Sequence, residues 1–323
     1  MAVLVYLDNS NGKIPKSGLE VAYYGSRIAK DHKTEAIAVV IGDVDDAELK
    51  VIGKYGIDKV LKTNENHLAN FDCCAYVKSL EKAVNETDAD IIVMVHNANG
   101  KALAPQLAVK LKAGLISTVV DFPSTDNGTF TVKRAVYSGK AFNFVSTSSQ
   151  KKILTLQSNS FSPEEIGSEA IVESFNSDTT EADVKTKVTE VSQVTDKVPI
   201  SEASVIVSGG RGMKGPENWG LLETLADLLG GTVACSKPVS DMGWRPHAEH
   251  VGQTGLSVRP DLYIAIGISG AIQHLAGVNG SKCIVAINTD PEAPIFSAAH
   301  YGIVGDAFDV TPKIIEAVRQ LVG

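Results

Sequence analysis

The sequence predicts an α/β protein with two domains, a larger N-terminal one and a smaller C-terminal one. Its 323 residues exceed the usual length of one folding unit. Strand-sized apolar runs alternate with segments whose apolar residues recur at helical spacing, which is typical of parallel sheets with helical crossovers. Residues 89–95 are apolar almost throughout, as a parallel strand covered on both faces requires.

The N-terminal domain is predicted to begin with four strand–helix units. The predicted strands are 3–7, 35–42, 58–63 and 89–95, and the predicted helices are 17–30, 46–55, 71–85 and 100–113. After Leu115 the rhythm changes, and three short strands joined by turns follow. We expect these strands, 129–136, 142–147 and 153–157, to be antiparallel additions to the edge of the sheet.

A polar segment separates the two predicted domains. Residues 158–196 are rich in Ser, Thr, Glu and Asp and contain one weak alternating strand, 185–194. We place the boundary near 196–201, which gives an N-terminal domain 1–197 and a C-terminal domain 198–323. The second domain has predicted strands at 203–208, 232–235, 261–266 and 282–288, and predicted helices at 218–229 and 312–321. This pattern predicts a smaller, doubly wound sheet.

The composition limits the classes of partner and the cellular location. A net charge of −8 argues against nucleic acid and anionic membrane surfaces as partners. The longest apolar runs are strand-sized, well short of the roughly 20 residues that a membrane-spanning helix needs. The opening residues MAVLVYLDN pass directly into a predicted strand and lack the features of a signal or transit peptide. We therefore expect a protein of the bacterial cytoplasm without direct membrane insertion. No cysteine or histidine spacing predicts a metal site.

Residues 262–277 read LYIAIGISGAIQHLAG, an apolar strand that breaks at small residues and enters a helix. The first N–H groups of a helix lack internal partners and attract anions, so such a turn suits a phosphate. Gly267 and Gly270 allow a ligand to approach the backbone, and Ser269 adds a hydroxyl donor. The turn predicts a nucleotide site.

Two other glycine-rich segments carry polar side chains. Arg211, in the turn SGGRG at 208–212, can fork onto a phosphate or a planar ring, although a plain turn with a surface arginine is an equal alternative. Gln253 and Thr254 lie in VGQTG at 251–255 and can form hydrogen bonds, and the alternative there is a polar surface loop. Both segments follow or precede predicted strands of the second domain.

Polar residues also follow the later strands. Asn288 and Asp290 come at the carboxyl end of a predicted parallel strand, where α/β proteins bind ligands, and Asp306 can bind a ribose hydroxyl. Helix caps and turns are the alternative roles for such residues. His274 is near a helix start, where a lone histidine is more often structural than catalytic. The sequence predicts neither a Ser-His-Asp arrangement nor a carboxylate pair, and therefore no hydrolytic site.

Taken in order, these motifs resemble the alpha subunit of electron transfer flavoprotein. They are SGGRG at 208–212, VGQTG at 251–255, GISGAIQHLAG at 267–277, VAINTDPEAPIF at 285–296 and YGIVGD at 301–306. They cover nearly all of the second domain, whereas the first domain agrees in length and element order. The resemblance implies that the second domain binds FAD. It also implies a heterodimer with a beta subunit that carries AMP, in which the first domain forms much of the interface.

The resemblance implies a set of FAD contacts. They are Arg211, Ser236, Lys237, Val251, Gly252, Gln253, Thr254, Ser269, Gly270, Ala271, Ile272, Gln273, His274, Asn288, Asp306 and Ala307. Arg211 would lie along the flavin and phosphates, and residues 269–271 would place backbone donors on the pyrophosphate. Gln273 and His274 would face the ribityl chain and the pyrimidine side of the flavin.

The remaining implied contacts divide between the two ends of the cofactor. Gln253 and Thr254 would bond near the flavin N5 and O4, and Ser236 would lie near the ring. Asn288 and Asp306 would hold the adenosine end.

One position departs from the family. Where the family has Gly or Cys, then Ser, then Arg, this chain has Cys235-Ser236-Lys237. The resemblance implies that the arginine stacks over the flavin and stabilises its anionic one-electron-reduced form, whereas lysine lacks the planar fork. A unit charge about 4 Å from a developing anion, at an effective dielectric of about 20, is worth roughly 4 kcal/mol, on the order of 170 mV. We expect Lys237 to support the reduced flavin less well than arginine would.

The resemblance implies an electron carrier rather than an enzyme. Its FAD would accept electrons from a primary dehydrogenase, such as an acyl-CoA or amine dehydrogenase, and pass them singly to a membrane quinone oxidoreductase. The FAD domain is expected to move about a hinge near 196–201. Two alternatives stay open: a NAD- or AMP-binding regulatory or sensory module without redox turnover, and an NAD-dependent enzyme.

Overall fold

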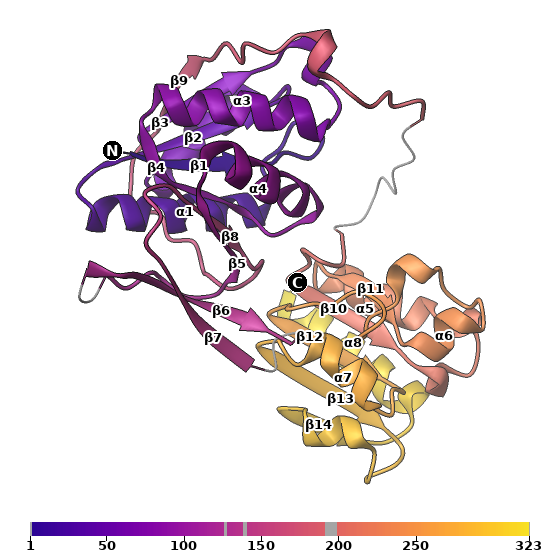
Figure 1. Cartoon of the computed structure of the whole chain (residues 1–323). Helices are drawn as coiled ribbons and strands as arrows, with labels where there is room; N and C mark the ends of the chain where they lie inside the picture. Colours follow the sequence, from indigo (N-terminus) through magenta and orange to yellow (C-terminus); the bar gives the residue numbers. More distant parts are fainter. Residues whose placement is uncertain (1, 126–127, 138–140, 191–198, 323) are drawn as a thin grey trace. The chain divides into compact units, whose positions relative to one another are not determined.

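A computed structural model describes residues 2–125, 128–137, 141–190 and 199–322 of the chain (Figure 1). The chain divides into two compact units, one comprising Met1–Val136 and Phe142–Ser192 and the other Tyr137–Ala141 and Gln193–Gly323. Both are α/β units with mainly parallel sheets, and the second is the smaller, which confirms the predicted fold class. The predicted boundary lies partly outside the described residues.

The first unit is built on a nine-stranded sheet of order β7-β6-β5-β8-β4-β1-β2-β3-β9. Its strands are β1 (Ala2–Leu7), β2 (Glu35–Ile41), β3 (Lys59–Thr63), β4 (Ala89–Val95), β5 (Gly114–Val119), β6 (Phe130–Val136), β7 (Ala141–Thr147), β8 (Lys152–Leu156) and β9 (Ile171–Ser174). Its helices are α1 (Lys16–Asp31), α2 (Asp46–Val51), α3 (Cys73–Glu86) and α4 (Ala98–Leu111). The elements predicted over the first 113 residues are confirmed to within a few residues, except that the helix predicted at 46–55 continues after α2 as a 3₁₀ turn.

Alternate residues of β1 face opposite sides of this sheet. Val3 and Val5 pack in a core with Val21 of α1, whereas Leu4 and Tyr6 pack in a second core with residues of α3 and α4. Figure 1 shows α1 and α3 on opposite sides of the sheet. Because successive side chains of a strand point to opposite faces of the sheet, one short strand contributes to two separate apolar layers.

The prediction for the later strands is partly wrong. β6 pairs antiparallel with β5, as expected of an added strand, but β8 pairs parallel with both β4 and β5 inside the sheet. Four of the five residues of β8 are buried, because the strand is covered on both faces. The parallel strands β5 and β9 were not predicted. The strand expected at 185–194 is absent over 185–190, and its remaining residues lie outside the described part of the chain.

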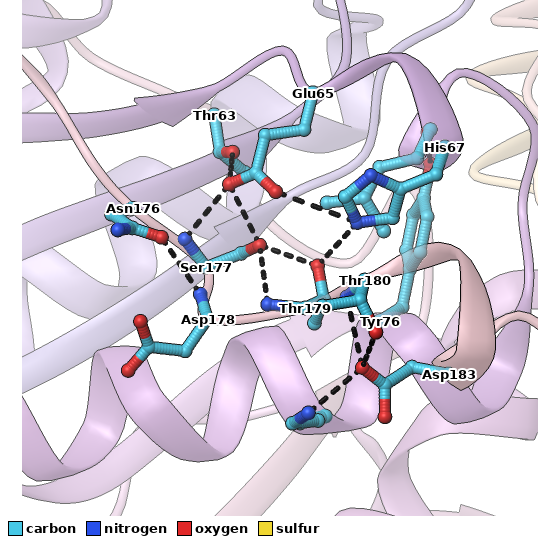
Figure 2. Close-up of polar contacts among 12 residues, drawn as sticks. Thr63, Glu65, His67, Tyr76, Asn176, Ser177, Asp178, Thr179, Thr180 and Asp183 are labelled. Carbon is cyan, nitrogen blue, oxygen red and sulfur yellow. Dashed lines mark hydrogen bonds and ion pairs between the residues drawn. The ribbon is translucent and has the colours of Figure 1, made fainter.

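The chain after β9 is held to the sheet by a polar cluster (Figure 2). Glu65 accepts hydrogen bonds from the Thr63 hydroxyl and from both the backbone N–H and the hydroxyl of Ser177. His67 Nε2 lies 2.7 Å from the Thr179 hydroxyl. Burial acts to raise the pKa of Glu65, but the Ser177 donors outweigh it and hold that pKa below its usual value.

Asp72 ties the same returning segment to α3. Its Oδ1 accepts from the N–H groups of Cys74 and Ala75 and so caps the helix. Its Oδ2 accepts from the N–H groups of Lys185 and Thr186 and from the Thr186 hydroxyl. One buried carboxylate therefore fixes both the start of a helix and a segment more than a hundred residues away.

The second unit is a five-stranded parallel sheet of order β11-β10-β12-β13-β14. Its strands are β10 (Val205–Gly209), β11 (Thr232–Cys235), β12 (Leu262–Ile266), β13 (Cys283–Asn288) and β14 (Tyr301–Val304), and its helices are α5 (Gly220–Leu228), α6 (Lys237–Asp241), α7 (Ile272–Val278) and α8 (Ala307–Val322). Within the described ranges, no helix is both long and apolar enough to cross a membrane.

The last helix begins earlier than predicted. The sequence places Pro312 at its start, but α8 begins at Ala307, where the Asp306 side chain accepts the N–H of Phe308 at 2.9 Å. Pro312 lies inside the helix. The cap at Asp306, rather than the proline, sets where the helix begins.

Replacing Asp72 with Asn should remove an acid-sensitive part of the stability. Burial acts to raise the pKa of Asp72, but the hydrogen bonds from Thr186, Ala75 and Lys185 outweigh it and hold the pKa at about 2. Because the folded pKa is depressed, this stabilisation is present above about pH 4 and is lost as the pH falls towards 2. We expect Asp72→Asn to lower the free energy of unfolding by about 2 kcal/mol near neutral pH.

Urea denaturation followed by circular dichroism, at neutral pH and near pH 2, measures this effect. The difference in the free energy of unfolding between wild type and Asp72→Asn should be smaller at low pH. Glu164→Gln, which changes an exposed acid, is the control. An equal difference in the free energy of unfolding at both pH values would contradict a stabilising role for the ionised Asp72 carboxylate.

Candidate functional site

A cavity of about 570 Å³ lies at the carboxyl ends of neighbouring strands of the second unit. It is bounded by the turns that follow β10, β11 and β12 and by Asn288 at the end of β13. In the sheet, β11 lies on one side of β10, whereas β12, β13 and β14 follow one another on the other side. Open α/β sheets bind ligands in the crevice at such a reversal of strand order. The volume suits a ligand of cofactor size.

The turns after β10 and β12 meet backbone to backbone at the edge of this cavity. The N–H of Gly210 donates to the carbonyl of Ile266 at 2.9 Å, and the N–H of Gly212 donates to the carbonyl of Gly267 at 3.0 Å. A Cβ on Gly212 would lie 2.6 Å from Gly267 Cα, and Gly267 itself has a φ of 63°. Only glycine allows both the close approach and this backbone conformation.

The turn after β12 presents backbone donors that the protein leaves unused. Among the described residues, no group accepts a hydrogen bond from the N–H of Ser269, Gly270 or Ala271. The Ser269 carbonyl accepts from the N–H of Ile295 at 3.0 Å, which fixes the turn. Three adjacent donors on the lining of a cavity suit an anionic group such as a phosphate.

The loop 251–254 forms another wall and is also held through its backbone. Val251 donates its N–H to the carbonyl of the last residue of β11 at 3.0 Å, and Gln253 donates to the carbonyl of Gln273 at 2.7 Å. A Cβ on Gly277 of α7 would lie 2.5 Å from Gly252 Cα, so the loop and the helix are in direct contact. This wall is therefore tied to the sheet and to α7.

Arg245 anchors the segment that leads into this loop. Its guanidinium donates through Nε and Nη2 to the two carboxylate oxygens of Glu249, both at 2.7 Å, and through Nη1 to Glu223 of α5 at 3.0 Å. It also lies 5.8 Å from the centre of the Trp219 ring. A bidentate ion pair of this kind fixes the orientation of the two side chains as well as their distance. The segment that precedes the loop is therefore fixed to α5 through Glu223.

His274 is buried with both ring nitrogens engaged. Nδ1 lies 3.1 Å from the carbonyl oxygen of Val251, and Nε2 lies 3.0 Å from the hydroxyl of Tyr263. Because a carbonyl can only accept, Nδ1 carries the proton and Nε2 accepts from the hydroxyl. Burial lowers the pKa of His274 to about 4, so the ring is neutral near pH 7. His274 holds the loop in place and supplies no charge.

The charged groups at the cavity differ in how they are paired. Arg211 is exposed, and the described part of the chain provides it with no ion pair. Lys237 Nζ lies 2.9 Å from Asp241 Oδ1, and both side chains are 54% exposed. Asn288 is engaged at both ends, donating to the carbonyl of Ile268 at 3.0 Å and accepting from the N–H of Asp290 at 3.0 Å.

Most of the residues that the sequence predicted lie together on this cavity. They are Arg211, Ser236, Lys237, Val251, Gly252, Gln253, Thr254, Ser269, Gly270, Ala271, Gln273, His274 and Asn288. Ile272, Asp306 and Ala307 are not among its lining residues. Ile272 is exposed on α7, Ala307 is buried, and Asp306 caps α8 and lies 3.3 Å from Lys214.

The lining also contains residues that sequence reasoning missed, namely Pro238, Ile268, Asp241 and His250. Asp241 could have been found, because it is four residues after Lys237 and a helix brings such a pair together. His250 directly precedes the VGQTG motif. Pro238 and Ile268 have no polar side-chain group that could have marked them.

Comparison with known proteins places the chain in a family. Residues 3–193 match the electron transfer flavoprotein domain, and residues 199–279 match the electron transfer flavoprotein FAD-binding domain. The electron transfer flavoprotein subunit alpha of Bacillus subtilis is 39% identical over 322 residues, covering 99% of this chain and 98% of the relative. That of Syntrophomonas wolfei is 38% identical, covering 98% of each chain. That of Pseudomonas aeruginosa is 36% identical, covering 98% of this chain and 100% of the relative. The chain therefore belongs to the electron transfer flavoprotein alpha subunit family, and its second unit contains the FAD-binding domain of that family.

Proposed function

We propose that this chain is the FAD-carrying subunit of an electron carrier that accepts electrons from a primary dehydrogenase and passes them singly to a membrane quinone oxidoreductase. The supporting observation is the cavity of the FAD-binding domain, with its unused backbone donors and its cationic side chains. Bound FAD supplies the reversible uptake and release of single electrons. The residues of the chain bind the cofactor, orient it and set the charge around it.

The cavity lining fits the chemistry of FAD. The N–H groups of residues 269–271 and the guanidinium of Arg211, for which the described residues provide no acceptor and no ion pair, suit the pyrophosphate. Gln253 and Thr254 are exposed on the opposite loop and are free to contact the polar edge of the flavin ring, near Ser236 and Lys237. Asn288 would influence the bound cofactor indirectly, because its side-chain amide holds the carbonyl of Ile268 in place. Asp306 and Ala307 could meet only a part of the cofactor that extends beyond this cavity.

The same lining favours a carrier over an enzyme that transforms a substrate. General acid–base catalysis needs a side chain that can give its proton to a substrate or take one from it. His274 is neutral with both nitrogens engaged, and Lys237 is paired with Asp241. These pairings engage His274 and Lys237. Among the described lining residues, His250 is the other histidine, and its Nδ1 has no hydrogen-bond partner.

The proposal includes a partner and a domain arrangement. We propose a heterodimer with a beta subunit that carries AMP, in which the first domain, 1–197, forms much of the interface. The FAD domain, 198–323, would move about a hinge near 196–201. The electron donor would be an acyl-CoA or amine dehydrogenase, and reduction assays against both classes would identify it.

Co-purification with the beta subunit tests the proposed function directly. The complex should be yellow and should release about one FAD on denaturation, since the cavity described above has room for one cofactor. Photoreduction should show uptake of electrons one at a time in the absorbance spectrum. A colourless complex that binds only NAD or AMP would instead support a regulatory nucleotide-binding module or an NAD-dependent enzyme.

Substitutions at Lys237 should change the redox potential of bound FAD. A cation favours the more negative, reduced cofactor, so Lys237→Gln should lower the one-electron midpoint potential. The half-exposed position and the pairing with Asp241 reduce the effect, which we expect to be on the order of tens of millivolts. Lys237→Arg should raise the potential, because the planar fork can stack on the ring.

Potentiometric titration of wild type, Lys237→Gln and Lys237→Arg measures the one-electron midpoint potential. Lys282→Gln is the control, because it removes an exposed lysine outside the cavity lining. Equal potentials for Lys237→Gln, Lys237→Arg and wild type would rule out a role for this side chain.

A further inference from the structure

His250 is a buried histidine that lines the cavity and has no role in the function proposed above. Its side chain is 2% exposed and contributes to the cavity lining. Its backbone is fixed on both sides, because its N–H donates to the carbonyl of His247 at 3.1 Å and its carbonyl accepts from the N–H of Leu256 at 2.8 Å. The backbone that carries the ring is therefore fixed directly before the loop 251–254.

The two nitrogens of the His250 ring have different surroundings. Nδ1 is buried, and within the described residues it has no hydrogen-bond partner. Gly255 packs against this edge, since a Cβ there would lie 2.7 Å from Nδ1. Nε2 lies on the side of Gly252, where a Cβ would be 3.3 Å away, and Gly252 is part of the cavity lining. The edge that carries Nε2 is the one available to a ligand.

The surroundings also keep this ring neutral. Burial lowers the pKa of His250, and its electrostatic interactions with His247 and Lys237 lower it further, against the opposite effect of Asp241. The rings of His247 and His250 are 5.5 Å apart. A neutral imidazole carries one proton, and a proton on Nδ1 would be a buried donor without an acceptor. The stable arrangement has the proton on Nε2.

We infer that His250 donates its Nε2–H to an acceptor atom of the flavin ring and is thus a further cofactor-contacting residue of this site. The inference rests on the proposed FAD function and deepens it. The ring is the expected partner because His250 adjoins the loop 251–254, whereas the unused backbone donors lie in the turn 269–271. A hydrogen bond strengthens as its acceptor gains negative charge, so this contact favours reduced flavin.

Three variants of the chain, each purified with the beta subunit and FAD, test the inference. His250→Leu removes the donor, and we expect it to shift the one-electron equilibrium about tenfold towards oxidised flavin, which is about 59 mV in midpoint potential. His250→Gln keeps an N–H donor at a similar reach and should stay close to wild type. His32→Leu, at an exposed histidine of the first unit outside the cavity lining, is the control and should also stay close to wild type.

A second measurement does not depend on any variant being stable. The ¹⁵N spectrum of the histidine rings in the wild-type complex should show His250 protonated at Nε2, with that signal shifted when FAD binds. A proton on Nδ1, an Nε2 signal that FAD leaves unchanged, or a wild-type potential in a folded His250→Leu complex would each overturn the inference. Failure of the wild-type complex to hold FAD would instead overturn the proposed function.

Discussion

Gly212 and Gly267 bring two neighbouring strand-end turns into backbone contact, and the cavity that we propose binds FAD is built on that contact. Each turn follows a parallel strand, so the sheet places them side by side, but only residues without a Cβ let them touch. The second turn then continues into residues 269–271, whose N–H groups have no acceptor within the described part of the chain. The backbone donors that we propose for the pyrophosphate thus belong to a turn positioned by contact between two glycines.

The opposite wall of the cavity is ordered by polar contacts rather than by glycine alone. The Arg245–Glu249 ion pair fixes the segment that leads into the loop 251–254. His274 fixes the first residue of that loop through the carbonyl of Val251. A neutral His274 achieves this without adding a charge near the flavin. The charged side chains at the site are Arg211, Lys237 and Asp241, which are exposed and whose interactions are therefore screened by salt.

How far the sequence predicts this molecule depends on whether a feature is local. β1 to β4 were predictable because each is an apolar run followed by a helical pattern, whereas the place of β8 in the sheet depends on pairing with distant strands. Polar residues of the glycine-marked turns, such as Arg211 and Ser269, were predictable from the sequence pattern. Ser236 and Lys237 were expected only because the chain resembles a known family. His250 was not, because its importance comes from burial against Gly255 and from the orphaned Nδ1. Ile272 adjoins the predicted phosphate turn in sequence, but its side chain is exposed on α7.

The dissociation constant of FAD from a Gly212→Ala complex tests the central claim most directly. Gly212 does not have a positive φ, so the added methyl group probes the contact with the Gly267 backbone without straining the backbone of residue 212. Gly220→Ala is the matched control, because a Cβ at that position would meet nothing within 4 Å. The account predicts that Gly212→Ala, while still folded by circular dichroism, binds FAD at least about tenfold more weakly than Gly220→Ala, a cost of about 1.4 kcal/mol. Equal affinity in the two variants would contradict it.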